Sequence, residues 1–147
     1  MTTTPPLRIC VLPGDGIGVE VIEATVPLLE KLAHDAPFAF AFSRHPAGAL
    51  HFRATGDALP QATLDAARDA DAILFGAMGW PEIRYHDGTE SAPQLDLRIA
   101  LELYAGVRPA RAIPGLRLPL ADPRARGIDL DGGRETKEGI FAARGKG

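Results

Sequence analysis

The sequence predicts an α/β fold built on an open parallel sheet with helices on both faces. Short apolar runs of strand length alternate with longer segments in which apolar residues recur every three or four positions. This alternation is typical of parallel sheets whose strands are joined by right-handed helical crossovers. A hydrophobic content of 46% with 24% charged residues indicates a packed core rather than a disordered chain.

The N-terminal segment predicts a strand, a tight turn and a helix. Residues 7–12 form a short apolar run that suits a buried strand, and the glycine-rich residues 13–18 suit a turn. A helix is expected from Val19 onward, with Pro27 inside it as a point where it can bend. Its buried stripe would consist of Ile22, Val26, Leu29 and Ala33.

The later elements follow the same pattern. Residues 38–42 are predicted to form a second strand, Pro60 to begin a second helix, and residues 72–75 to form a third strand. The buried side of the helix after Pro60 would contain Leu64, Ala67 and Ala70. Residues 94–103 are predicted to be helical and 104–107 extended. Residues 109–127 contain four prolines and no helical period, which predicts a loop or a crossover between domains.

Composition excludes several classes of partner. The formal charge of -3 and the pI near 5.8 leave no basic patch for nucleic acid or anionic lipid. No apolar run approaches the roughly 20 residues that span a bilayer, and no signal peptide precedes Leu7, so we expect a cytoplasmic protein. The single cysteine, Cys10, excludes an intrachain disulfide and is expected to be a small core residue.

Two glycine segments follow predicted strands. Residues 14–18 do not match the G-x-G-x-x-G dinucleotide fingerprint, because position 19 is valine, and no Gly-Lys-Ser/Thr follows to make a phosphate-binding Walker loop. A structural turn is therefore the favoured interpretation by pattern alone. Residues 76–81 follow the third strand, and in open α/β sheets ligands bind beyond the carboxyl ends of strands. The two turns either line one crevice or are two ordinary loops.

Three arginines favour the crevice. Arg98, Arg108 and Arg134 come from several elements, and each guanidinium can grip one carboxylate through two charge-assisted hydrogen bonds. Such a set suits a small polycarboxylate. In a helix over residues 94–103, Gln94 and Leu95 lie on the face of Arg98, four and three residues before it.

The sequence resembles the metal-dependent β-decarboxylating dehydrogenases of isopropylmalate, isocitrate, tartrate and D-malate. The resemblance rests on the ordered combination of residues 12–18, 70–77, 97–98, 104–109, 128–130 and 134–135, and it covers essentially the whole chain. It implies an isopropylmalate dehydrogenase-like open sheet, which is not a true Rossmann fold and which is incomplete in this chain. Residues 1–108 would be the N-terminal part of the large cofactor-binding domain, and 109–147 the crossover and the start of the second, dimerisation and substrate domain.

The resemblance also assigns roles to individual residues. Arg98, Arg108 and Arg134 match the three arginines that bind the carboxylates of the shared malate-like core, and Ser91, Gln94 and Leu95 fall near the variable substituent or the nicotinamide. Gln94 favours a substrate that is smaller or more polar than isopropylmalate, whereas Leu95 alone would suit an apolar one. The implied cofactor-binding residues are Ile17, Gly76, Ala77, Met78, Gly79, Pro81 and Ala92.

The implied chemistry is oxidation and decarboxylation of a 2-hydroxy-dicarboxylate with NAD, or NADP, and Mg²⁺ or Mn²⁺. In the family, aspartates hold the metal and a lysine and a tyrosine transfer protons. No aspartate of this chain matches the metal-ligand motif, so no metal residue is assigned. Phe141 occupies the usual tyrosine position, so no catalytic residue is assigned either.

The expected function is therefore that of a dehydrogenase acting on tartrate, D-malate or an isopropylmalate-like acid, a homodimer when full length. The chain resembles a truncated family member and is expected to leave apolar faces uncovered. The alternative is a noncatalytic fragment, or a family-like protein that binds carboxylates without turnover.

Overall fold

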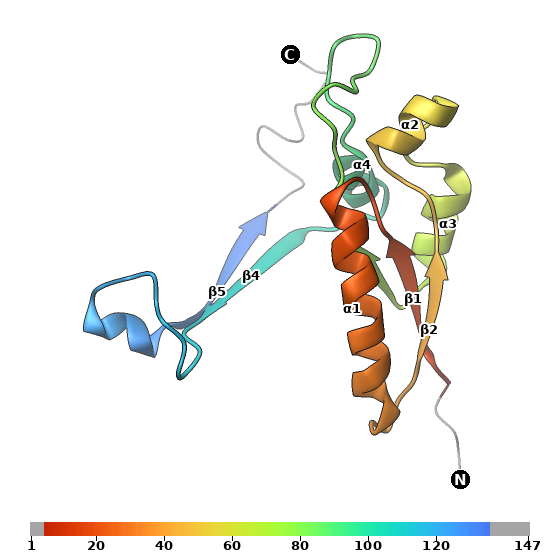
Figure 1. Ribbon diagram of the computed structural model, residues 1–147. Helices are drawn as coiled ribbons and strands as arrows, with labels where there is room; N and C mark the ends of the chain where they lie inside the picture. Colours follow the sequence, from red (N-terminus) through yellow and green to blue (C-terminus); the bar gives the residue numbers. More distant parts are fainter. Residues whose placement is uncertain (1–4, 136–147) are drawn as a thin grey trace. The chain divides into compact units, whose positions relative to one another are not determined.

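The computed structural model describes residues 5–135, which divide into two compact units (Figure 1). The first unit ends at Leu101 and the second begins at Glu102. This division falls before the boundary expected after Arg108. We describe each unit by itself.

The first unit contains a parallel sheet in the order β2-β1-β3. Its strands are β1 (Leu7–Leu12), β2 (Phe40–Arg44) and β3 (Ala72–Phe75). In the register, Ile9 of β1 is opposite Phe42 of β2 and Ala72 of β3. The predicted parallel sheet is therefore confirmed, and β1 lies at its centre.

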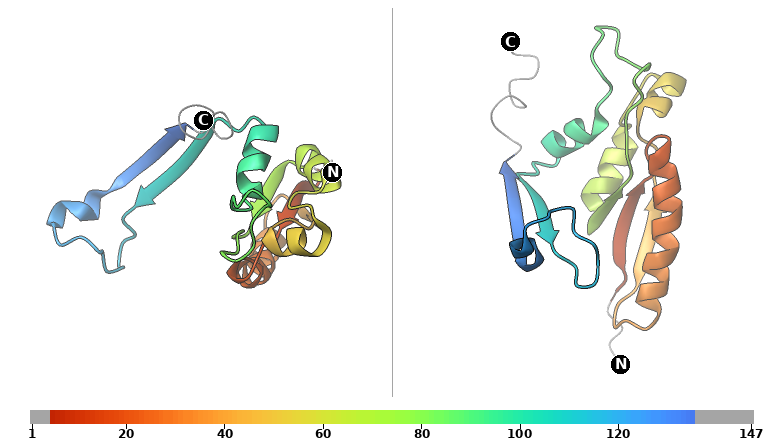
Figure 2. Two further views of the ribbon diagram at one scale, coloured as in Figure 1. Left: turned by 90° about the horizontal axis from the view of Figure 1, so that it is seen from above. Right: turned by 60° about the vertical axis from the view of Figure 1, so that its left-hand side comes forward.

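Helices cover both faces of this sheet (Figures 1 and 2). Side chains alternate along β1, as the pleat of a strand requires. Cys10 and Leu12 pack in a cluster with Ala67 and Leu97, whereas Val11 packs with buried residues of the first helix. The helices are α1 (Ile17–His34), α2 (Ala49–Thr55), α3 (Gln61–Asp69) and α4 (Pro93–Ala100). The fold class predicted from the sequence is thus correct.

The start of β3 is tied to β1 by Arg8 and Asp71. The Arg8 backbone N–H donates to Asp71 Oδ2 at 2.7 Å, and its guanidinium lies 3.3 Å from Oδ1. The backbone hydrogen bond from Arg8, followed by the side-chain one, lowers the pKa of the Asp71 carboxyl. In the core, burial raises the pKa of the Cys10 thiol, and the expected core role of this residue is confirmed.

Close backbone approach between two loops requires glycine at two positions. A Cβ on Gly76 would collide with the Pro13 carbonyl oxygen, and one on Gly14, whose φ is 77°, would collide with the Ala77 carbonyl oxygen. The loops that follow β1 and β3 therefore pack backbone against backbone. This contact is a structural reason for glycine at both sites.

The second unit contains an antiparallel strand pair and a short 3-10 helix. β4 (Ala105–Arg111) pairs with β5 (Asp129–Glu135), and η1 (Pro123–Gly127) lies in the connection between them. An ion pair joins Arg111 Nε, at the end of β4, to Asp129 Oδ1, at the start of β5, at 2.8 Å.

Most predicted elements are confirmed, with four corrections. β2 begins at Phe40 instead of residue 38, α4 ends at Ala100 instead of residue 103, and Arg108 lies inside β4 rather than after a strand. α2 was missed, because only seven residues form it and its N-terminus is stabilised by a carboxylate from a distant segment. An edge strand tolerates Pro109, whose missing N–H need not join the ladder.

The outer face of α1 is apolar and exposed. Val21, Leu28 and Leu32 are 52%, 61% and 71% exposed, on the side away from buried Ile22 and Val26. The expectation of uncovered apolar faces in this chain is confirmed for this helix. Among the described residues, no helix has the length and apolar character needed to cross a membrane.

Gly76→Ala is expected to destabilise the first unit. The added methyl group meets backbone atoms of Pro13, which cannot move without separating the two loops, and such overpacking costs at least about 2 kcal/mol. Urea denaturation followed by circular dichroism measures the change. Gly127→Ala, where a Cβ meets no atom within 4 Å, is the control and should change the unfolding free energy little.

Candidate functional site

The residues predicted to bind ligand are distributed over both units. The glycine turn, the loop after β3, and Gln94, Leu95 and Arg98 belong to the first unit, whereas Arg108 and Arg134 belong to the second. Phe141 lies outside the described residues. Each group is considered in its own unit.

A buried carboxylate organises the carboxyl edge of the parallel sheet. Asp15 is 3% exposed and follows β1 in the glycine turn. Its Oδ2 accepts from the backbone N–H groups of Ala49 at 2.8 Å and Gly79 at 2.9 Å, and its Oδ1 accepts from that of Leu50 at 2.9 Å. Three segments far apart in the sequence therefore meet at one side chain.

The same carboxylate explains the short helix α2. Ala49 and Leu50 are its first two residues, and their N–H groups have no partner within a helix. The carboxylate satisfies both and places a negative charge at the positive end of the helix. Gly48 is required beside it, since a Cβ there would lie 2.6 Å from Asp15 Oδ2.

The two glycine loops lie side by side at the carboxyl ends of the adjacent strands β1 and β3. The Asp15 N–H donates to the Ala77 carbonyl at 2.8 Å, and the Gly76 N–H donates to the Leu12 carbonyl at 2.8 Å. Of the predicted cofactor residues in this region, Ile17, Ala77 and Pro81 are exposed, Gly79 is half-buried, and Gly76 is buried. Met78 packs against the core cluster of Cys10 and Leu12.

Two buried polar atoms without a partner in the described part of the chain lie at the start of helix α4, one just before the helix and one in its first turn. Among the described residues, Ser91 Oγ and Gln94 Oε1 make no hydrogen bond, although Ser91 is only 1% exposed. Ala92, buried and predicted to contact the cofactor, is the N-cap and offers no side-chain hydrogen bond. Buried polar atoms of this kind are rare in native proteins and cost about 1–3 kcal/mol each, so they call for an explanation.

The guanidinium of Arg98 lies on the same helix face as Gln94. The two residues are four apart in α4, a spacing that places side chains one turn above each other. Leu97 is buried in the core cluster and anchors the helix, while Arg98 is exposed and Leu95 is half-buried. The predicted grouping of Gln94, Leu95 and Arg98 thus follows from a helix that the structure contains.

In the second unit, Arg108 and Arg134 project from one face of the β4–β5 pair. Arg108 is opposite Gly132, and Arg134 is opposite Gly106, so the two arginines are diagonal neighbours. Residues in such positions lie about 7–8 Å apart on the same side of the ladder. Each arginine faces a glycine across the ladder, and a glycine places no side chain in that space.

Gly132 and Gly133 do not interrupt the strand before Arg134. Both glycines belong to β5 and pair with Arg108 and Val107. All seven residues of β5 pair in register with the seven of β4, so the antiparallel ladder is continuous through both glycines.

The described residues offer no cluster suited to a metal ion. No group of three or more histidine, cysteine, aspartate or glutamate side chains comes together in residues 5–135. Asp15, the buried acid nearest the predicted cleft, already uses both oxygens for backbone N–H groups. This donor set does not fit a divalent cation.

The parallel sheet with paired glycine loops at its carboxyl edge, and the arginines on α4 and on the β4–β5 pair, occur in the order expected from the resemblance to the β-decarboxylating dehydrogenases. The profile of the isocitrate/isopropylmalate dehydrogenase family matches residues 8–147. The chain belongs to this family.

Individual relatives agree with this assignment. The chain is 37% identical to the 3-isopropylmalate dehydrogenase of Desulfitobacterium hafniense, with 91% of this chain and 40% of the relative covered. It is 38% identical to that of Gloeobacter violaceus, with 95% and 40% covered. The chain therefore spans about 40% of the length of these curated relatives.

Solved structures are also similar. The TT0538 protein of Thermus thermophilus matches with a TM-score of 0.73 and 39% identity, over 92% of this chain and 25% of that one. Isocitrate dehydrogenase from Methylococcus capsulatus matches with a TM-score of 0.74 and 30% identity, over 92% and 36%.

Sequence reasoning missed the role of Asp15. The residue stands between two glycines in a turn, a context that indicates a special backbone but not its partners. Those partners lie 34, 35 and 64 residues away, so no local period reports them.

Asp15→Asn is expected to destabilise the first unit by about 2–3 kcal/mol, because an amide places N–H groups against backbone donors in a buried site. Hydrogen exchange should show loss of protection first in α2 and in the loop after β3. Asp65→Asn, which alters an exposed carboxylate on α3, is the control. Equal stability of the two variants would contradict the structural role of Asp15.

Proposed function

We propose that this chain supplies the carboxylate-recognition residues and part of the cofactor cleft of a nicotinamide-dependent β-decarboxylating dehydrogenase. Its substrate would be a 2-hydroxy-dicarboxylate. The observation that carries the proposal is the placement of Arg108 and Arg134 on one face of the β4–β5 pair, each opposite a glycine. Two forked donors at this spacing suit a ligand with more than one carboxylate.

The resemblance to the family implies the same role, carboxylate binding, for Arg98 of α4. This arginine is exposed and shares a helix face with Gln94, whose buried oxygen has no partner among residues 5–135. In this role it would orient the malate-like core, while Gln94 and Leu95 contact the substituent that distinguishes one substrate from another. The relatives named above act, by their names, on 3-isopropylmalate.

The orphaned atoms favour a substituent that carries a hydroxyl group. Gln94 Oε1 needs a donor, and Ser91 Oγ can donate or accept. A hydroxyl does both, whereas an isopropyl group would leave these atoms unsatisfied and a carboxylate would not donate to the amide oxygen. Tartrate is therefore the preferred substrate, with D-malate and isopropylmalate as weaker ones.

The two glycine loops would hold a nicotinamide cofactor, which when bound would supply the chemistry of hydride transfer. Exposed Ile17, Ala77 and Pro81 at the carboxyl ends of β1 and β3 support this position, since ligands of open α/β sheets bind there. The backbone packing of Gly14 and Gly76 would keep the loops close together and hold their exposed side chains in place. Either NAD or NADP is compatible with these residues.

A second candidate is a carboxylate-binding protein without turnover. Phe141 occupies the position expected for the tyrosine, and a phenyl ring cannot transfer a proton. Among residues 5–135, no cluster of side chains is suited to hold a metal ion. Turnover would need these groups from elsewhere in the protein or from the partner of a homodimer.

Arg108→Ala is expected to weaken tartrate and D-malate binding about tenfold to hundredfold, the worth of a charge-assisted hydrogen bond. Affinity is measured by isothermal titration, and turnover by the absorbance of reduced cofactor with NAD or NADP and Mn²⁺. Where the reading frame extends beyond Gly147, the longer protein is assayed too. Arg117→Ala, an exposed arginine of the same unit, is the control.

The outcomes separate the two candidates. Binding with turnover supports the dehydrogenase, and binding without turnover supports the carboxylate-binding protein. Unchanged affinity in Arg108→Ala would remove this arginine from the site.

Gln94→Leu is expected to shift selectivity from tartrate toward isopropylmalate by at least about tenfold, because the amide that recognises a hydroxyl becomes apolar. The measurement is the ratio of the two dissociation constants. Gln61→Leu, on the exposed side of α3, should leave the ratio unchanged. The hydroxyl preference is wrong if both variants behave alike.

A further inference from the structure

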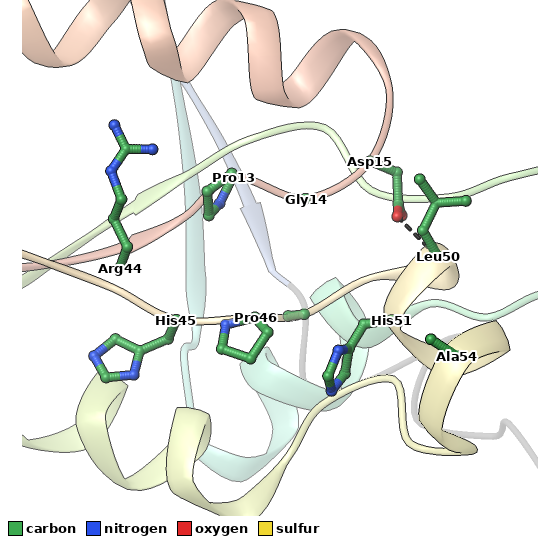
Figure 3. A pocket seen from close by; sticks show the side chains of 10 residues that line it. Pro13, Gly14, Asp15, Arg44, His45, Pro46, Leu50, His51 and Ala54 are labelled. Carbon is green, nitrogen blue, oxygen red and sulfur yellow. Dashed lines mark hydrogen bonds between the residues drawn. The ribbon is translucent and has the colours of Figure 1, made fainter.

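A cavity of about 460 Å³ opens at the carboxyl ends of β1 and β2 in the first unit (Figure 3). It lies on the β2 side of β1, whereas the loop after β3 follows the strand on the other side. Its volume is within the range of small-molecule sites. Its lining includes Asp15, Arg44, His45, Pro46, Leu50 and His51.

The imidazoles of His45 and His51 offer hydrogen-bonding nitrogens to a ligand in this cavity. Asp15 is the one acid among the described lining residues, and its oxygens are occupied by backbone N–H groups. Arg44 is bound to Glu23, with Nη1 2.6 Å from Oε1, and Figure 3 shows it projecting away from the two histidines. The side-chain donors beside Pro46 are therefore those of His45 and His51.

The two imidazoles lie on the same side of the segment that joins β2 to α2. Figure 3 shows the ring of Pro46 between them. His45 Nε2 lies 3.2 Å from Ser43 Oγ, which leaves Nδ1 for another partner. Both histidines are half-buried, and the segment itself is held by the bond from Thr63 Oγ1 to the Pro46 carbonyl at 2.8 Å.

The remaining lining is apolar and comes from prolines, alanines and Leu50. An apolar surface between two imidazole donors suits a flat ligand with an apolar body and an acceptor at its edge. We propose that this cavity binds a small planar carboxylate, whose ring packs on Pro46 while its oxygens accept from His45 and His51. Carboxylate is preferred to a neutral acceptor, because hydrogen bonds to an ionised group are the stronger ones.

This site is separate from the proposed substrate site. None of its lining residues is one of the three arginines or belongs to α4. It takes an aromatic monocarboxylate rather than a 2-hydroxy-dicarboxylate. Loss of dehydrogenase activity would therefore not count against carboxylate binding in this cavity. Failure of the cavity to bind a carboxylate would likewise not count against the dehydrogenase function.

The test is a titration of the whole chain with benzoate, followed through the imidazole signals of its four histidines by NMR. Benzamide, which lacks the charge, and acetate, which lacks the ring, are the matched probes. Benzoate should shift the signals of His45 and His51 and should bind at least about tenfold more tightly than either of the other probes. His45→Gln and His51→Gln should each weaken benzoate binding by about tenfold.

His34→Gln is the control, because His34 is an exposed histidine paired with Asp35 at the end of α1. It should leave benzoate affinity unchanged. Equal shifts of all four histidine signals, or unchanged affinity in both cavity variants when circular dichroism shows them folded, would overturn the proposal. Equal binding of benzoate and benzamide would overturn its carboxylate preference.

Discussion

The first unit depends on one interaction, the capture of three backbone N–H groups by the carboxylate of Asp15. It joins the turn after β1 to the start of α2 and to the loop after β3. All three segments lie at the carboxyl edge of the sheet, where backbone groups have left the strand ladder and need new partners. A charged acceptor serves several donors at once, which a neutral side chain of the same size does less well. The two regions proposed to bind ligands, on the β3 side and the β2 side of β1, therefore share one structural support.

This constraint also explains which parts of the fold the sequence could predict. β1, α1 and β3 were found because their own periodicity and length report them. α2 is stabilised by a residue 34 positions away, and the start of β2 depends on its register with β1, in which Leu7 is opposite Phe40. Neither is a local property. β4 extends through Pro109 because it pairs with β5. This partner follows only after a long connection, so the local composition around Pro109 indicates a loop and does not report the strand.

For the site, residue types were more predictable than their environment. The arginines and Gln94 were singled out by chemistry and by resemblance to the family, and helix spacing correctly placed Gln94 beside Arg98. The unsatisfied oxygens of Ser91 and Gln94 could not be foreseen, because burial and hydrogen bonding depend on the tertiary packing of α4 through Leu97. Because these oxygens have no partner among the described residues, the start of α4 is a second place, besides Arg98, where a ligand would find hydrogen-bonding groups. A ligand that supplied hydrogen bonds to these two atoms, at and just before the first turn of α4, would stabilise the folded protein.

The glycines of the β4–β5 pair lower the local stability of the two strands. Glycine in a strand loses more conformational entropy than other residues and packs nothing, at a cost of about 0.5–1 kcal/mol relative to alanine. Yet Gly132 and Gly106 stand opposite Arg108 and Arg134. A β-branched residue at either position would strengthen the strand and occupy the face from which the guanidinium projects. If Arg108 and Arg134 act on one ligand, an empty position beside each is what allows a carboxylate to approach between them. In that case Gly132 and Gly106, which cost the two strands local stability, would leave space for the substrate.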